Sequence, residues 1–310
     1  ISILLAEQIL AMFLTMAVGF GVVRAGLFKT EDSRIISNMV VYICNPCVVV
    51  HSFQIELTDD KIKGLMIAIG LSVVVHMVLI IGSEILSFIF HFNSIEKASI
   101  IYTNAGYLVI PLVGAVLGEE WVFYTTAFIL VQTVLMWTHG VKLIGQEKEL
   151  NIRKILCNPN VIAMIIGIAL FALEIRLPTV VDSCVSGFGD MISPASMMVI
   201  GMVIGDVDLK WVFHQKRPYL ICLLRLIVFP LIAVVAFAGL ERSGIHPDAE
   251  YILMIVLIAT SAPAAAMITQ LAQIYGKDSR YASVINVMSV IFCIITMPVM
   301  VLSYEMLIAL

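Results

Sequence analysis

The sequence predicts an all-α membrane protein with ten transmembrane helices, arranged as a five-plus-five inverted repeat with two broken, crossing helices (spans four and nine). Three observations predict it: an apolar composition, ten apolar segments of spanning length, and two pairs of prolines at nearly one offset. Of the 310 residues, 61% are hydrophobic and 13% are charged, and the mean hydropathy is +1.06. Soluble domains contain about 45–50% apolar and about 25% charged residues. The net charge of −4 gives no reason to expect nucleic acid as a partner.

A helix needs about 20 predominantly apolar residues to cross a lipid bilayer. Ten segments approximate this length: 1–23, 35–54, 64–90, 97–117, 121–141, 159–175, 180–205, 218–240, 249–274 and 281–307. Further spans follow the first one, which is therefore predicted to be a span and not a cleaved signal. The chain begins at Ile1 without a methionine, so we expect a short start to precede it. The longest polar connection is 142–158, which is too short for a soluble domain.

Lysine and arginine in the connections predict the orientation of the chain. Thirteen of these residues lie in odd-numbered connections and four in even-numbered ones, and Arg225 lies inside a span. Positive residues favour the cytoplasmic side. We therefore expect a multi-pass protein of the plasma membrane, with the odd-numbered connections in the cytoplasm and both termini outside.

Two pairs of prolines indicate an internal repeat. Pro46 in span two and Pro194 in span seven are 148 residues apart, and Pro111 in span four and Pro263 in span nine are 152 apart. An odd number of spans in each half gives the halves opposite orientations, a plan common among secondary transporters. Chance agreement is the alternative, because proline is frequent in spanning helices.

Pro111 and Pro263 also predict two interrupted helices near the membrane midplane. Proline removes one backbone donor and clashes with the carbonyl one turn earlier. Freed backbone groups are tolerated in a bilayer only inside protein or beside a water-filled cavity. The amide ends of an interrupted helix favour anions and the carbonyl ends favour cations. If the two helices cross, their interruptions form the expected substrate site; for either proline alone, a simple kink is the alternative.

Small and polar residues near the prolines and inside other spans are the candidate site residues. The predicted substrate-binding residues are Asn104, Gly106, Pro111, Gln132, Thr260, Ser261, Pro263, Asn45, Arg225 and Asn286. Gln132 and Asn286 can each donate and accept hydrogen bonds to a bound solute. We expect no catalytic residue, metal or cofactor. Cys44 and Cys47 form a CxxC pair, but no second pair of the kind a zinc site needs is present, so we interpret both as small hydrophobes.

Two titratable residues inside spans each have two interpretations. Arg225 either extends to the cytoplasmic surface or faces inward and attracts an anion. His76, at the matching place in the first half, is either a proton carrier or a histidine hydrogen-bonded between helices. No carboxylate stands at mid-depth in a span. His76 and backbone carbonyls therefore remain as candidates for a coupling ion, H⁺ or Na⁺.

Four stretches carry a likeness by their order and spacing: "NAGYLVIPLVGAVLGEE" (104–120), "NPNVIAMIIGIALFALEIRLP" (158–178), "GDMISPASMMVIGMVIGD" (189–206) and "SAPAAAM" (261–267). They resemble the auxin efflux carrier family, which includes the plant PIN-FORMED carriers and bacterial permeases for malate and malonate. The likeness covers essentially the whole chain. The sequence departs from the family at Val109, where glycine is frequent. It also lacks the long central loop of many plant carriers, which fits a bacterial-type permease better.

The resemblance implies the fold shared with bile-acid:sodium symporters and an elevator-like mechanism, with Asn104 and Gln132 near the substrate. It also implies a homodimer in the lipid bilayer. The chain would form one transporter unit. Its expected divisions are repeat one (1–145), repeat two (155–310), a scaffold of spans 1, 2, 6 and 7 (about 1–54 and 159–205) and a transport part of spans 3–5 and 8–10 (about 64–141 and 218–307).

These features predict a secondary active transporter of a small organic anion, a mono- or dicarboxylate. An efflux carrier for auxin-like aromatic carboxylates is the alternative. An intramembrane enzyme would need a nucleophile–base or metal constellation at depth, and the sequence has no paired aspartates, HExxH or GxSxG motif. A sensor or receptor with a transporter fold and a channel are the remaining classes. Saturable flux stimulated by substrate on the opposite side separates a carrier from a channel.

Overall fold

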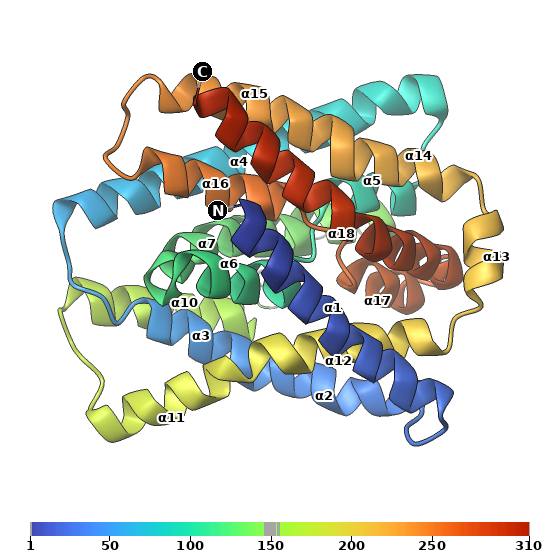
Figure 1. Cartoon of the computed structure of the whole chain (residues 1–310), viewed down its shortest axis with the longest axis horizontal. Helices are drawn as coiled ribbons and strands as arrows, with labels where there is room; N and C mark the ends of the chain where they lie inside the picture. The colour runs from blue at the N-terminus through green and yellow to red at the C-terminus, as the bar shows by residue number, and fades with distance from the viewer. Residues whose placement is uncertain (1, 146–152, 154–155, 310) are drawn as a thin grey trace.

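The computed structural model describes residues 2–145, 153 and 156–309, and it is helical (Figure 1). The first half contains α1 (Ser2–Arg24), η1 (Thr30–Asp32), α2 (Ser33–Met39), η2 (Val40–Cys44), α3 (Asn45–Ser52), α4 (Asp59–Phe90), α5 (Ser94–Ile101), η3 (Ala105–Val109), α6 (Ile110–Leu117), α7 (Glu119–Leu135), η4 (Met136–Gly140) and α8 (Val141–Gly145). The second half contains α10 (Pro159–Ala172), α11 (Thr179–Asp190), α12 (Ile192–Gly205), α13 (Leu209–His214), α14 (Arg217–Leu223), η5 (Leu224–Val228), α15 (Phe229–Glu241), α16 (Ala249–Ser261), α17 (Met267–Ile274) and α18 (Ser279–Ile308). Within the described residues, the extended backbone amounts to one isolated β-bridge. Most of the predicted polar connection 142–158 lies outside the described residues.

Seven helical segments of the described chain are long and apolar enough to cross a membrane, by length and composition. They are Glu7–Arg24, Thr30–Ser52, Asp59–Phe90, Glu119–Gly145, Thr179–Gly205, Arg217–Glu241 and Ser279–Ile308. The predicted spans four, six and nine contain the shorter apolar helices Ala105–Leu117, Pro159–Ala172 and Ala249–Ser261. Spans four and nine are divided by non-helical residues, and the helix of span six ends early, which explains the lower number. The prediction of an all-α, multi-pass membrane protein is confirmed.

Three of the four π-helical turns among the described helices end two residues before a proline. These turns are η2, η3 and η5, which precede Pro46, Pro111 and Pro230. A π-helical turn is wider than an α-helical one, so it accommodates the proline ring, which would otherwise clash with a carbonyl one turn earlier. Pro111 therefore continues its helix. The interruption in span four lies before it, at residues 102–104, which corrects the expected position of the break.

The helices gather into two groups that share a central region. Figure 1 shows α2, α3, α10, α11 and α12 in the lower half of the view and α4, α14, α15 and α16 in the upper half. α1 packs along α12 and also contacts α18, so it lies between the groups. Between the groups lie α6 and α7, with α5 above and α17 below on the right side of the view. The boundary between the groups passes close to the interruptions.

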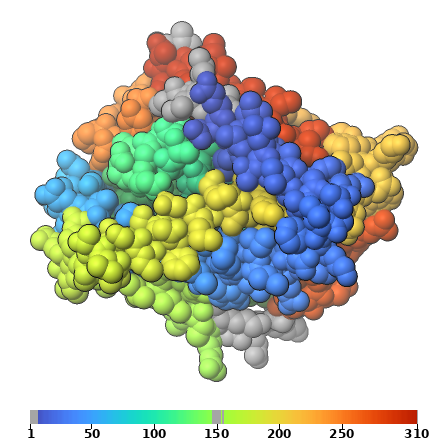
Figure 2. Space-filling model, turned by 60° about the horizontal axis from the view of Figure 1, so that its bottom comes forward, coloured from blue at the N-terminus to red at the C-terminus, as the bar shows by residue number. Residues whose placement is uncertain are grey.

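Glycines allow α1 and α12 to approach backbone to backbone. A Cβ atom on Gly201 would lie 1.9 Å from the Met16 carbonyl oxygen, and one on Gly19 would lie 2.3 Å from the Met198 carbonyl oxygen. Such distances leave no room for any side chain, and small residues are typical where spanning helices touch this closely. Figure 2 shows α12 (yellow) beside the α1 and α2 segment (blue) on one face of the molecule. The two helices form the most closely packed pair in the fold.

A buried carboxylate connects four helices at the opposite end of the molecule from the α3–α4 connection. Arg217 donates to Glu96 from Nε at 2.6 Å and from Nη2 at 3.1 Å, and also donates to the Phe90 carbonyl at 2.7 Å. The Tyr281 hydroxyl donates to Glu96 at 2.8 Å. Burial acts to raise the pKa of Glu96, but hydrogen bonds from Arg217, the Asn93 amide and Tyr281 outweigh it and hold the pKa below its ordinary value of 4.5. Glu96 thereby links α4, α5, α14 and α18.

Candidate functional site

The two interrupted helices meet at their non-helical residues. We call these residues, 102–104 and 262–266, the crossover. Thr103 and Ala264 form an antiparallel β-bridge. The Asn104 N–H donates to the Pro263 carbonyl at 2.8 Å, and on the other side of the bridge the Ala265 N–H donates to the Tyr102 carbonyl at 3.0 Å. Each interruption thus supplies backbone partners to the other, as the absence of water inside a bilayer requires.

Side chains from α7 and α18 complete the hydrogen bonding of the bridge. Gln132 accepts from the Thr103 N–H at 2.8 Å and donates to the Thr103 carbonyl at 2.8 Å. On the other edge, Ser289 accepts from the Ala264 N–H at 3.1 Å and Asn286 donates to the Ala264 carbonyl at 2.6 Å. Gln132 and Asn286 therefore have backbone partners, which gives both residues a structural role. Their binding of a solute stays a prediction.

Arg225 lies beneath the crossover and is only 1% exposed. Its Nη1 donates to the Ile100 carbonyl at 3.1 Å and its Nε donates to the Ala262 carbonyl at 3.2 Å. The Nη2 atom is buried and has no hydrogen-bond partner among the described residues. Of the two interpretations of Arg225, extension to the surface is therefore wrong, and the side chain faces inward.

The position of Arg225 determines the electrostatics of the crossover. The carbonyl ends of α5 and α16 and the amide ends of η3–α6 and α17 all lie there, and each helix end carries about 0.5 elementary charge. The four ends alone cancel. The guanidinium offsets the two carbonyl ends, so the amide ends leave a net positive charge of about one unit. No salt bridge joins Arg225 to a carboxylate in the described part of the chain. The crossover therefore favours an anion.

Two asparagines lie beside the amide end of η3. Asn104 is 5% exposed, and its side chain makes no capping hydrogen bond to η3. Asn45, at the start of α3, is equally buried, and its Oδ1 has no partner within the same set. A Cβ on Gly106 would lie 3.3 Å from Asn45 Nδ2. The absence of a side chain at Gly106 therefore lets the Asn45 amide approach the backbone of η3.

The other predicted residues occupy different positions around the crossover. Thr260 donates to the Val256 carbonyl of its own helix at 2.6 Å, and Ser261 has a buried hydroxyl without a partner in the described chain. The ring of His76 lies 4.8 Å from that of Phe128. Its Nδ1 donates to a carbonyl of its own helix at 2.7 Å, and its Nε2 has no partner among the described residues. Both Ser261 and His76 Nε2 thus retain unused hydrogen-bonding capacity.

A polar cavity of about 210 Å³ lies between α3, α6, α11 and α12. Its lining includes Val48, His51, Ser52, Pro111, Glu119 and Ser193. These residues lie toward the connections that the sequence assigns to the outside. The cavity brings Pro111 into the candidate site as a wall residue. It is large enough for several water molecules, which occupy about 30 Å³ each in the liquid.

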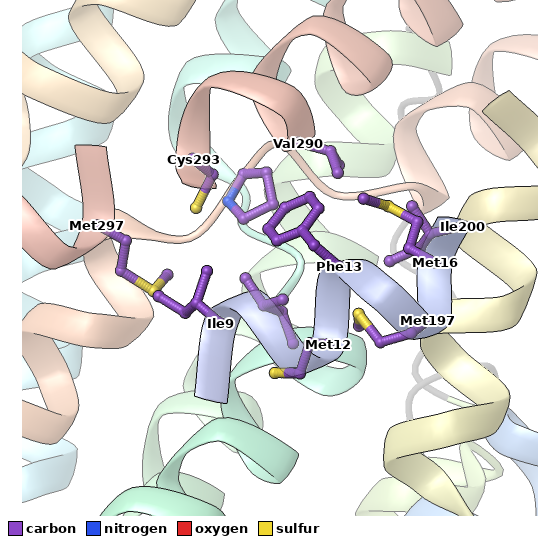
Figure 3. A pocket seen from close by; sticks show the side chains of 11 residues that line it. Ile9, Met12, Phe13, Met16, Met197, Ile200, Val290, Cys293 and Met297 are labelled. Atoms are coloured by element: carbon purple, nitrogen blue, oxygen red, sulfur yellow. The ribbon is translucent and has the colours of Figure 1, made fainter. Parts of the chain in front are cut away.

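A much smaller apolar hollow, of about 10 Å³, lies where α1 and α12 meet α18 and Pro263. Figure 3 shows Met12 and Met16 of α1 and Met197 of α12 facing Val290, Cys293 and Met297 of α18 across it. The hollow is at the lower limit of the space that one water molecule needs. The contact between these helices is therefore dry, and flexible methionine side chains fill most of it.

Sequence reasoning missed two serines at this site. Ser289 completes the bridge, and its place three residues after Asn286 on one helix face is a signal that could have identified it. Ser196 is fully buried on α12, and its hydroxyl has no partner in the described chain. It lies one helical turn after Ser193 of the polar cavity. Its position next to a cavity becomes visible only when α3, α6 and α12 are placed in space.

The sequence matches a known family over almost its whole length. The model of the membrane transport protein family matches residues 4–152 and 147–301, which together cover almost the whole chain. The chain belongs to this family, the auxin efflux carriers. No curated protein matches the chain. Membership of the auxin efflux carriers identifies a membrane transport protein, and it agrees with the apolar helices and with the order of the four stretches noted in the sequence.

Proposed function

We propose that this auxin efflux carrier family member is a secondary active transporter that carries a small organic anion, a mono- or dicarboxylate. One observation supports the choice of an anion: Arg225 occupies the carbonyl ends of both interrupted helices, at Ile100 and Ala262. The amide ends then face the site with their positive partial charge uncompensated. A carboxylate at these amide ends would accept hydrogen bonds from η3 and from Asn104.

The same contacts weigh against a metal cation at the crossover carbonyls. The carbonyls of Thr103 and Ala264 are bonded to Gln132 and Asn286, and Cys293 lies 3.6 Å from the Ser261 carbonyl as a donor. A sodium site would have to displace several of these bonds, because sodium-like hard cations need oxygen ligands. We therefore propose H⁺ as the coupling ion, with His76 as its carrier.

For the architecture we propose ten spans in two inverted halves, with the two crossing helices as spans four and nine. The bridge between Thr103 and Ala264 supports the crossing of spans four and nine, because it joins the interruptions of the two helices. The group of α1, α2, α3, α10, α11 and α12 would form the scaffold, and the remaining spans would move against it. The dry, methionine-rich contact at Met12 and Met197 suits such movement, because methionine repacks easily.

Movement of this kind has a structural consequence at Tyr107. Its hydroxyl lies 2.8 Å from the Ser37 hydroxyl, across the boundary between η3 and α2. In the proposed mechanism this bond breaks when the crossover shifts along the scaffold. The polar cavity between α3 and α12 would connect the crossover to the side of the even-numbered connections, with the carboxyl groups of Glu119 and Asp190 in its lining.

Transport by purified protein in proteoliposomes tests the proposal. We expect saturable uptake of at least one labelled carboxylate from a panel that includes malate, malonate and indole-acetate, stimulated by unlabelled carboxylate inside. Asn104→Ala should reduce uptake at least tenfold, because an amide donor at the amide end of η3 is lost. Thr15→Ala, at a half-buried position of α1 where the hydroxyl bonds within its own helix, serves as the control. Unsaturable flux, or unchanged uptake in Asn104→Ala, would refute a carrier with its site at the crossover.

A further inference from the structure

We infer that Ser196 and Asn45 form a polar subsite on the α3–α12 wall that binds a hydroxyl group of the transported anion. This inference rests on the proposed function, since it concerns the specificity of the same site. It assigns to Ser196 a role in substrate selection, and it divides the ligand into two parts. The carboxylate lies at the amide ends of the crossover, and a neutral hydrogen-bonding group lies against the wall.

The depth of both residues follows from helix geometry. Val48 of α3 and Ser193 of α12 line the polar cavity. Asn45 lies three residues before Val48, and Ser196 lies three residues after Ser193, so each is one turn deeper on the same helix face. The two helices run in opposite directions, and α12 contacts both η2 and η3. Asn45 and Ser196 therefore lie below the floor of the cavity, on the way to the crossover.

Both side chains have unused hydrogen-bonding capacity. Asn45 is 5% exposed and Ser196 is fully buried. Asn45 Oδ1 and Ser196 Oγ have no partner among the described residues, and they make no bond to each other. An unpaired buried polar group costs about 1–3 kcal/mol, and most such groups in proteins are satisfied by protein, ligand or ordered water. Each of the two side chains can therefore accommodate a further hydrogen-bonding partner.

The chemistry of the pair specifies that group. Asn45 Oδ1 can only accept, whereas the Ser196 hydroxyl can donate or accept. A carboxylate cannot donate, so it cannot satisfy Asn45 Oδ1. A hydroxyl can donate to Asn45 and accept from Ser196 at the same time. The wall therefore suits a hydroxy acid better than the same acid without its hydroxyl.

Binding of matched acids to the purified full-length chain tests this inference. The probes are three pairs that differ by hydroxyl groups: glycolate and acetate, lactate and propionate, and tartrate and succinate. Affinity is obtained from the rise in unfolding temperature with acid concentration. We expect the hydroxy acid of at least one pair to bind about tenfold more tightly, as one hydrogen bond in a buried site would give.

Variants separate a role in selection from a role in folding. Ser196→Ala should bring the ratio of the two affinities, hydroxy acid over unsubstituted acid, close to one, without changing the affinity for the unsubstituted acid. Ser196→Thr keeps a hydroxyl at this position and should keep the preference. Ser83→Ala removes a buried serine that bonds within its own helix and should leave the preference intact. If Ser196→Ala does not fold, Ser196→Cys replaces it and should also lose the preference.

The outcomes distinguish failure of this inference from failure of the proposed function. Equal affinity for both acids of every pair that binds, or an unchanged preference in Ser196→Ala, would overturn the subsite and leave an anion carrier. Absence of binding by every carboxylate would overturn the proposed function and the subsite together.

Discussion

Gln132 pairs with the backbone of Thr103 as a neighbouring β-strand would. Its Oε1 accepts from the Thr103 N–H at 2.8 Å, its Nε2 donates to the Thr103 carbonyl at 2.8 Å, and the Thr103 hydroxyl donates to the same Oε1 at 3.0 Å. One side chain thereby satisfies both backbone groups of a residue that lies outside any helix. The interrupted helix depends on this amide as much as on its partner across the bridge.

Replacement of Gln132 by alanine should destabilise the protein by about 2 kcal/mol, because two backbone groups lose their partners inside the bilayer. Asn286→Ala removes one bond, to Ala264, and should cost about half as much. Unfolding temperatures in one detergent compare the two variants with the wild type. Equal unfolding temperatures for Gln132→Ala and the wild type would show that the bridge does not need the hydrogen bonds from the Gln132 side chain.

Gly201→Ala should prevent the normal packing of α1 against α12, because the new Cβ would lie 1.9 Å from the Met16 carbonyl oxygen. We expect a loss of stability of several kcal/mol or a failure to fold, as is typical for overpacked backbone contacts. Gly21→Ala is the matched control in α1, since nothing lies within 4 Å of its Cβ position. It should stabilise the helix by about 0.5–1 kcal/mol. Expression yield and unfolding temperature measure both effects.

Acid should lower the folding stability of the protein, because Glu96 becomes protonated. Its hydrogen bonds with Arg217 and Tyr281 hold its pKa in the folded state below the ordinary value of 4.5. A lowered pKa means that Glu96 contributes stability above pH 4.5 and loses that contribution as the pH falls through the folded-state pKa. The unfolding temperature of the wild type should therefore fall between pH 5 and pH 3 more steeply than that of Glu96→Gln. Parallel curves for the two proteins would contradict this assignment.

His76→Gln should separate proton coupling from substrate binding. If His76 carries the coupling proton, the variant loses uptake driven by a pH gradient but keeps exchange of labelled for unlabelled carboxylate at constant pH. The Nε2 atom has no partner in the described structure, so a proton can be added there without breaking a hydrogen bond. Uptake driven equally well by the gradient in His76→Gln would exclude this residue as the carrier.

The sequence located the crossover but not its hydrogen bonds. The proline pair Pro111 and Pro263 identified the two interrupted helices, because proline disturbs helical backbone wherever it stands. The break in span four lies at residues 102–104 and not at Pro111, because a π-helical turn before Pro111 accommodates the proline ring. A proline in a spanning helix can mark either an interruption or a helix that continues through a π-helical turn, and the proline alone does not distinguish the two.

The role of Arg225 was also undecided at the level of sequence. Its distance along the helix allowed it to reach either the surface or the interior. The choice depends on the carbonyls of Ile100 and Ala262, which lie 125 and 37 residues away in the chain. Ser196 was missed for a similar reason: a serine in an apolar helix is unremarkable until its lack of a partner is known.

A carboxylate and its uncharged amide distinguish most directly whether the crossover binds an anion. Propionate and propionamide, or succinate and succinamide, differ in charge but little in shape, and their stabilisation of the wild type, Arg225→Lys and Arg225→Met can be measured by thermal shift. We predict that the carboxylate stabilises the wild type and, more weakly, Arg225→Lys, while the amide does not, and that folded Arg225→Met loses the difference. Equal stabilisation by carboxylate and amide in the wild type, or undiminished preference for the carboxylate in Arg225→Met, would contradict it.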